Sequence, residues 1–238
     1  MKWKVRLTGN ERGLETLAES FTDDPEVFED DDNFFLWSSQ FEDLEDTDEV
    51  RDTAEEIVRT IRNLGAKDSL RTEDLQASHV HEINEDGTEH VTVRAESSTV
   101  KMRAGPVRVT TTDEDGNTSV HRPADRTYEL TQLAAEDDKV RELVALLDKG
   151  DDWVNLYRIY EFIQANIDGD DNIVDRDWWS SNEKDRFKQT ANSRDAIGDD
   201  ARHGQERIPA PDNPMTYSDA KALVDSLIRN WLEHRREL

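Results

Sequence analysis

The residues best suited to chemistry lie between positions 184 and 207, where basic side chains are unusually frequent. Six Lys and Arg residues stand there against five carboxylates, whereas the whole chain has a formal net charge of -26. Arginine is a planar, bidentate donor that suits phosphate or carboxylate groups. His203, directly after Arg202, is able to transfer a proton near neutral pH. Together with Arg194 and Asn192, these two residues form the candidate catalytic group.

A structural role is the alternative for the same side chains. His203 is suited to the C-terminal end of a helix, where the dipole favours a cation, and Asn192 to a helix cap. Residues 190–206 show neither a helical nor a strand period, so the pattern does not decide between a connector and a site. Arg202 has three candidate carboxylate partners: Asp199, Asp200 and Glu161.

A second candidate group is rich in histidine. If Asp86-Gly87 is a two-residue turn, His81 pairs with Thr92 across a hairpin. Zinc accepts three histidines in catalytic sites, but Arg94 shares this face and its positive charge disfavours a cation. We therefore predict a solvated polar face and no metal or other cofactor, with a zinc site as the alternative. The register places three histidines on one face: His79, His81 and His90.

The composition is strongly acidic. The chain has 56 Asp and Glu against nine Lys and 21 Arg, and its mean hydropathy is -0.92. Such a charge opposes compaction by self-repulsion. It is tolerable where salt shortens the Debye length, which is about 3 Å at 1 M ionic strength. The composition resembles that of salt-adapted archaeal proteins.

Acidic runs are therefore interpreted first as solvated surface. Residues 13–50 contain 15 carboxylates and no Lys or Arg. Clustered oxygen ligands suit divalent cations, but no segment has the spacing of a dedicated calcium loop. The acidic runs indicate no specific function.

Several function classes are excluded by what the sequence lacks. The absence of Cys removes disulfides, thiolate nucleophiles and Cys-ligated zinc. No phosphate-binding glycine loop, nucleophile elbow or zinc-protease motif occurs. The first nine residues are too short and too alternating for a signal peptide, and about 18 consecutive apolar residues occur nowhere. We expect a cytoplasmic protein with no membrane partner.

Residues 1–128 carry mainly the period of two that marks half-buried strands. Apolar side chains at positions 3, 5 and 7 alternate with basic ones. Asp-Gly pairs predict hairpins because both residues accept positive φ. The hairpin turns are predicted at 86–87 and 115–116, and further strands at 34–38 and 98–103.

Two helices complete this first half. Apolar spacing predicts a short helix over 14–21 and a longer one over 50–64. Gly65 is suited to end the longer helix in a left-handed cap. The first half is predicted as an α+β domain with a mainly antiparallel sheet and two helices.

Residues 129–238 have the period of helices instead. Thr216, with Asp219 three residues on, predicts an N-cap before the last and clearest apolar stripe. Four amphipathic helices with short connections favour an all-α bundle of the four-helix type. Helices are predicted near 140–147, 153–163, 183–191 and 216–231.

The second half resembles, distantly, the HEPN domains. The segments "DDWVNLYRIYEFIQ", "RFKQTANSRDAIGDDARHG" and "PMTYSDAKALVDSLIRNWL" carry the resemblance, over roughly residues 137–235. Where such domains are active, the resemblance implies metal-independent RNA cleavage in a dimer. His203 would then move the proton, and Arg202 or Arg194 would stabilise charge at phosphorus. Many members are instead inert binding or dimerisation modules.

The first functional hypothesis is a non-catalytic binding or interaction protein that self-associates, or binds a protein partner, through its helical half. The alternative is a metal-independent ribonuclease that uses the Arg/His group on RNA. A histidine-face metal protein is a third hypothesis.

Overall fold

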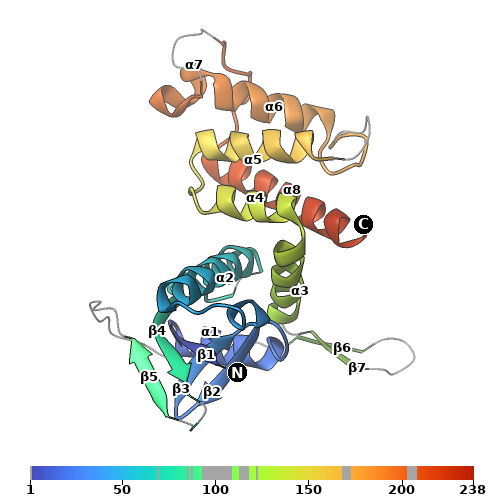
Figure 1. Cartoon of the computed structure of the whole chain (residues 1–238). Coiled ribbons are helices and arrows are strands. Elements are labelled where there is room, and N and C mark those ends of the chain that lie inside the picture. Colours follow the sequence, from blue (N-terminus) through green and yellow to red (C-terminus); the bar gives the residue numbers. More distant parts are fainter. Residues whose placement is uncertain are drawn as a thin grey trace. The chain divides into compact units, whose positions relative to one another are not determined.

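The computed structural model describes residues 2–68, 70–84, 86, 88–92, 109–112, 118–121, 123–167, 173–202 and 208–238. The chain divides into two compact units, Met1–Glu136 and Asp137–Leu238. The first contains a sheet with helices and the second is helical (Figure 1). The predicted α+β class, an antiparallel sheet followed by a helical region, is confirmed.

A five-stranded antiparallel sheet forms the first unit, in the strand order β2-β3-β1-β4-β5. The alternation predicted for the first strand is confirmed, because Trp3, Val5 and Leu7 are all buried in the core. The strand predicted at 34–38 is also present, as β3. The strands are β1 (Trp3–Thr8), β2 (Glu26–Asp30), β3 (Asn33–Trp37), β4 (Gln76–Ile83) and β5 (Glu89–Thr92).

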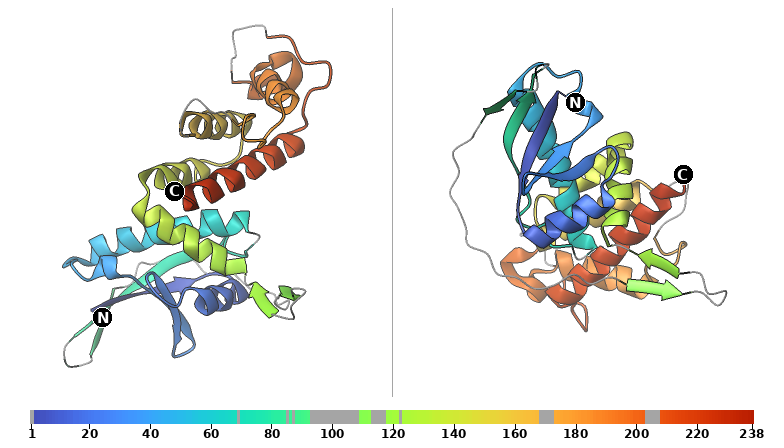
Figure 2. Two further views of the ribbon diagram at one scale, coloured as in Figure 1. Left: turned by 90° about the vertical axis from the view of Figure 1, so that its right-hand side faces the viewer. Right: turned by 90° about the horizontal axis from the view of Figure 1, so that it is seen from below.

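Helices α1 and α2 pack on one face of this sheet, and α3 packs on both helices (Figure 1 and Figure 2). The two helices predicted in the first half are confirmed. The third was not predicted, and the change of period near residue 128 falls inside it. The unit contains α1 (Glu11–Ser20), the short 3-10 helix η1 (Ser39–Phe41), α2 (Thr47–Lys67) and α3 (Pro123–Glu136).

The sequence predicted that Gly65 ends α2, and this prediction is wrong. The helix continues to Lys67, and Asp68 is its C-cap. A Cβ added at Gly65 would lie 2.8 Å from the Thr72 hydroxyl oxygen and 3.3 Å from a methyl carbon of Leu70. The glycine is therefore needed for the close approach of the following loop to the helix and not for a left-handed conformation.

The acidic run at 28–33 forms a tight hairpin that the sequence did not predict. Asp30 pairs with Asn33 across the turn between β2 and β3. Asp31 and Asp32 have φ angles of 49° and 60°, and two adjacent positive φ values mark a turn whose twist suits a hairpin. Aspartate tolerates this conformation because its short polar side chain bonds locally. Because the turn contains no glycine, neither this hairpin nor strand β2 was predicted.

The connection between β4 and β5 is longer than predicted. Ile83 pairs with Glu89, so residues 84–88 form the connection. The Asp86 carboxylate accepts hydrogen bonds from the backbone N–H and the hydroxyl of Thr88, at 3.0 and 2.6 Å. This side-chain turn replaces the predicted two-residue Asp-Gly turn, which is wrong.

The longer connection shifts the register of the hairpin by one residue, which turns each side chain of one strand to the other face. His81 pairs with Val91, one residue before its predicted partner, and His90 pairs with Glu82. His90 therefore lies on the opposite face from His81. The prediction that His79, His81 and His90 share one face is wrong.

The other predicted hairpin forms a separate two-stranded sheet. Strand β6 (Val109–Thr112) pairs with β7 (Thr118–His121) in antiparallel register. The Asp115-Gly116 turn and the strand predicted at 98–103 lie outside the described residues.

The four helices predicted in the second half are all present. Thr216 is the N-cap of the last, because its hydroxyl accepts from the Asp219 backbone N–H at 3.1 Å. Part of the stretch from 190 to 206 is helical after all, in the end of α6, in α7 and in η2. None of the described helices combines the length and the hydropathy needed to cross a bilayer. The elements are α4 (Asp138–Leu147), α5 (Trp153–Ala165), α6 (Ser181–Asn192), α7 (Arg194–Ile197), the 3-10 helix η2 (Gly198–Asp200) and α8 (Tyr217–Arg236).

An aromatic cluster forms part of the core of the second unit. Phe187 on α6 is fully buried and contacts four rings at centroid distances from 5.3 to 6.4 Å. Burial raises the pKa of Tyr160 to about 12, so this phenol stays neutral. The indole N–H of Trp179 donates to the Leu223 carbonyl at 3.1 Å, which ties the cluster to α8. The four rings belong to Trp153, Tyr157, Tyr160 and Trp179.

Candidate functional site

Arg202 is held by two contacts to α5. Its Nη2 lies 3.1 Å from the Glu161 carboxylate, and its guanidinium carbon lies 4.5 Å from the centroid of the Tyr157 ring. Glu161 and Tyr157 are one helical turn apart, so a single arginine spans both. The Arg202 backbone N–H also donates to the Ala191 carbonyl at 3.0 Å. Of the three carboxylates that the sequence offered, Glu161 is the partner.

Arg194 begins α7 and forms an ion pair with Asp199 of η2. Both side chains are more than half exposed. An exposed ion pair contributes at most about 1 kcal/mol. This ion pair therefore contributes little stability, and the carboxylate in it is a different one from the partner of Arg202.

Asn192 lies at the last position of α6 and is 8% exposed. Its side-chain N–H donates to the Lys188 carbonyl at 2.8 Å, as expected of a residue that closes a helix. Its Oδ1 atom is buried and accepts no hydrogen bond among the described residues. The bond between Arg202 and Ala191 brings Arg202 close to this end of α6.

His203, the proposed proton-transfer residue, lies outside the described residues. The structure thus brings Arg202 near the end of α6 that carries Asn192, and pairs Arg194 with Asp199. The four predicted residues are not seen as one assembled group.

A buried lysine network on the sheet was not predicted. Lys4 is 4% exposed although it alternates with core residues and so lies on the opposite face of β1. Its Nζ donates to Asp30 at 2.7 Å and lies 2.8 Å from Glu89, and it sits 4.4 Å above the Phe35 ring. The second oxygen of Glu89 lies 2.8 Å from His81 Nδ1.

This network holds strands together and does not supply a nucleophile. Burial lowers the pKa of Lys4, but the hydrogen bonds to Asp30 and Glu89 outweigh burial, so the pKa is raised overall. The hydrogen bonds from Lys4 and His81 lower the pKa of Glu89. Lys4 therefore stays an ammonium ion at neutral pH, which cannot attack a carbonyl group. The ammonium group links β1 to the strands at both edges of the sheet.

The part of the chain that the structure describes has no group of three or more His, Asp or Glu side chains placed to hold a metal ion. The shifted β4–β5 register accounts for this at the histidines, because His90 is turned away from His81.

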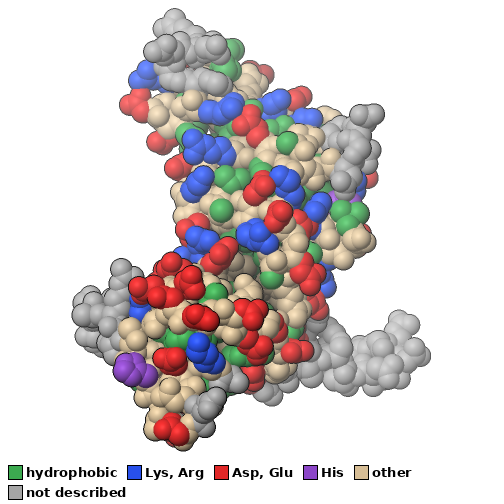
Figure 3. All heavy atoms as spheres, viewed as in Figure 1, with side chains coloured by type: hydrophobic (Ala, Val, Ile, Leu, Met, Phe, Trp, Pro, Cys, Tyr) green, Lys and Arg blue, Asp and Glu red, His purple; other side chains and the backbone are tan. Residues whose placement is uncertain are grey.

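The two units differ in charge. Residues 1–136 hold 33 Asp and Glu against 15 Lys and Arg, whereas residues 137–238 hold 23 against 15. Figure 3 shows carboxylates gathered on the first unit, while Lys and Arg are interspersed with Asp and Glu on the second. An anionic partner is therefore repelled less by the helical unit than by the first.

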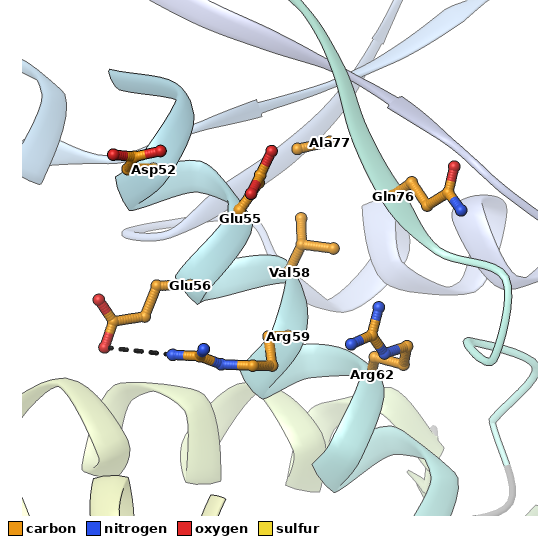
Figure 4. Close-up of a pocket in the computed structure, with 8 residues that line it drawn as sticks. All are labelled: Asp52, Glu55, Glu56, Val58, Arg59, Arg62, Gln76 and Ala77. Atoms are coloured by element: carbon orange, nitrogen blue, oxygen red, sulfur yellow. Dashed lines mark ion pairs between the residues drawn. The ribbon is translucent and has the colours of Figure 1, made fainter. Parts of the chain in front are cut away.

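A pocket of about 540 Å³ lies between α2 and the start of β4 (Figure 4). Its charged residues follow one stripe of the helix at spacings of three and four residues. The spacing was visible in the sequence, but we made no prediction for the polar face of this helix. The pocket is lined by Asp52, Glu55, Glu56, Val58, Arg59, Arg62, Gln76 and Ala77.

No protein-family model, no curated protein and no solved structure matches this chain.

Proposed function

We propose that this protein is a non-catalytic binding protein whose helical unit associates with a second copy of the chain. The position of Arg202 is the observation that supports this best. A ribonuclease needs a guanidinium directed at the phosphate, whereas this one rests on Tyr157 and pairs with Glu161. A phosphate would have to displace both contacts. The resemblance to HEPN domains remains a prediction. The non-catalytic members of that family are binding or dimerisation modules, which is the kind of function proposed for this chain.

The proposal is tested first by an RNA-cleavage assay. We expect no cleavage that depends on His203 when RNAs of varied sequence and structure are incubated in about 1 M KCl with EDTA. High salt matches the screening that the acidic surface requires. Wild type and His203→Ala should give the same background by gel electrophoresis.

A matched control separates catalysis from folding. Arg141→Ala removes an arginine from an exposed ion pair with Asp138 on α4, away from the candidate site in the sequence. Cleavage that is lost in His203→Ala and Arg202→Ala but kept in Arg141→Ala would establish the ribonuclease instead.

Tyr217 is the side chain that supports association best. It is 42% exposed at the start of α8, yet its hydroxyl donates to the Asp151 carbonyl at 3.0 Å and its ring lies edge-on to Trp153. An exposed aromatic that is already held in one orientation loses little entropy on binding. Tyrosine is also frequent among residues that dominate interface energies.

We expect the dimer fraction to rise between about 0.1 and 2 M KCl, because the Debye length falls from about 10 Å to below 3 Å and repulsion between acidic copies weakens. Multi-angle light scattering across this range measures it, and Tyr217→Ser should shift the mass towards the monomer. A monomer at every salt concentration contradicts self-association and leaves a different protein as the partner.

A further inference from the structure

The sheet face that carries Lys4 and Phe35, here called the outer face, lies opposite the face that α1 and α2 cover, and it already holds one ammonium group. Lys4 Nζ lies 4.4 Å from the centroid of the Phe35 ring, 2.7 Å from Asp30 and 2.8 Å from Glu89. An aromatic ring beneath a cation and carboxylates beside it both stabilise the positive charge. The outer face therefore accepts a cation at Phe35.

Trp37, Phe28 and Glu26 repeat this combination of rings and a carboxylate on the same face. Trp37 is directly opposite Glu26 in the register of β2 and β3, and Phe28 is opposite Phe35, with ring centroids 5.9 Å apart. Leu36, between Phe35 and Trp37, is fully buried in the core, so its two neighbours lie on the outer face. Trp37 and Phe28 are diagonal neighbours, about 7–8 Å apart by backbone. Together they form an aromatic surface with a carboxylate at its edge.

These three side chains reach solvent. Glu26, Phe28 and Trp37 are each partly exposed. The Glu26 carboxylate forms no ion pair or hydrogen bond in the part of the chain that the structure describes. The indole N–H of Trp37 donates to no described acceptor either, whereas that of the buried Trp3 donates to the Leu44 carbonyl at 3.0 Å. A buried indole N–H usually has a partner, so the Trp37 group faces water and is open to a ligand.

The charge around these residues favours a cationic partner. Residues 13–50, which include β2 and β3, carry 15 carboxylates and no Lys or Arg. Two basic residues of β1 share the outer face. The charge of Lys4 is offset by two carboxylates, and Arg6 pairs opposite Phe35 and not opposite Trp37. Long-range attraction therefore steers a basic segment towards this part of the molecule.

Arginine suits the site better than lysine. A guanidinium is planar, so it stacks on an indole ring while its N–H groups donate to a carboxylate at the ring edge. Arg202 already makes this pair of contacts within the second unit, where it lies over the Tyr157 ring and pairs with Glu161. Trp37 and Glu26 offer the same two partners on the outer face of the sheet.

We propose that Trp37, Phe28 and Glu26 form a docking site for a partner protein that presents an arginine-rich segment. One arginine of the segment stacks on Trp37 and pairs with Glu26, and its methylene groups pack against Phe28. This inference is independent of the function proposed for the helical unit, because all three residues belong to the first unit.

Fluorescence anisotropy of labelled peptides, titrated with the full-length protein, tests the class of partner. The probe is a peptide of alternating Arg and Gly, and the comparison peptides carry Lys or Gln in place of Arg. At about 0.2 M KCl, we expect the Arg peptide to bind at least about twofold more tightly than the Lys peptide and about tenfold more tightly than the Gln peptide. Equal affinity for the three peptides, or no binding of the Arg peptide, overturns the proposal.

Variants of the ring and of the carboxylate locate the site. Trp37→Leu keeps an apolar side chain but removes the aromatic face, and it should weaken binding of the Arg peptide by about two- to fivefold. Trp37→Phe keeps a ring and should bind nearly as tightly as the wild type. Glu26→Gln should weaken binding by about two- to fivefold, as expected for one partly exposed ion pair.

A matched control separates this site from general attraction to an acidic protein. Glu15→Gln removes the same charge from an exposed position of α1, on the other side of the sheet, and should weaken binding by less than about twofold. Circular dichroism verifies that the variants keep the wild-type fold. If Trp37→Leu and Glu26→Gln weaken binding no more than Glu15→Gln does, the peptide is held by the overall charge and the proposal is wrong.

Discussion

Replacing Phe187 with alanine is expected to lower the free energy of unfolding of the helical unit by about 3–5 kcal/mol. Phe187 is fully buried, and its ring meets four other aromatic rings. Truncation to alanine leaves a cavity that the large planar neighbours fill poorly. Urea denaturation in about 1 M KCl, followed by tryptophan fluorescence, measures the loss because Trp153 and Trp179 belong to the cluster.

Two controls qualify this result. Phe187→Leu keeps most of the volume and should cost clearly less than the alanine variant. Asp185→Ala changes an exposed residue of the same helix and should alter stability by no more than about 0.5 kcal/mol. A loss below about 1 kcal/mol for Phe187→Ala would mean that the aromatic cluster is not packed as described.

Gly13→Ala is expected to destabilise the first unit by about 2 kcal/mol or more, although alanine is the better helix former. In an unconstrained helix, this change gains about 1 kcal/mol. In α1, however, the added Cβ would lie far inside the van der Waals contact distance of the Arg71 carbonyl oxygen. That atom belongs to the backbone and cannot rotate away, so the helix or the loop must shift.

The sign of the change in the thermal unfolding midpoint tests this prediction. Thermal unfolding monitored by circular dichroism should give a lower midpoint for Gly13→Ala than for the wild type. Glu15→Ala, at an exposed position of the same helix, should leave the midpoint nearly unchanged. A rise in the midpoint of Gly13→Ala would show that α1 does not approach the loop at Arg71 so closely.

Local patterns predicted most of the secondary structure. The alternation of Trp3, Val5 and Leu7 predicted β1, and apolar spacing predicted α2 and the four long helices of the second unit. These patterns arise because each element buries one face. Burial of one face places apolar residues at the period of that element, about 3.6 residues for a helix and two for a strand. The hairpin at Asp31 and Asp32 was missed because its turn uses aspartate in place of glycine.

The candidate site depends on contacts that no local pattern contains. The charges and their neighbours identified Arg202 and offered Glu161 as one of three partners, but the choice among them followed from the packing of α5 against the end of α6. The Lys4 network joins residues on four strands, β1, β2, β4 and β5, and it forms only in the observed register.

The sequence by itself determined the acidic surface, the α+β class and the order of a sheet unit before a helical unit, because composition and period are properties of neighbouring residues. Only the tertiary structure decided that His90 faces away from His81, that Arg202 rests on Tyr157, and that one stripe of α2 lines a pocket. The Arg202 contact and the pocket depend on how segments distant in the chain meet. The orientation of His90 depends on the register of a hairpin, where a shift of one residue is enough to turn a side chain to the other face.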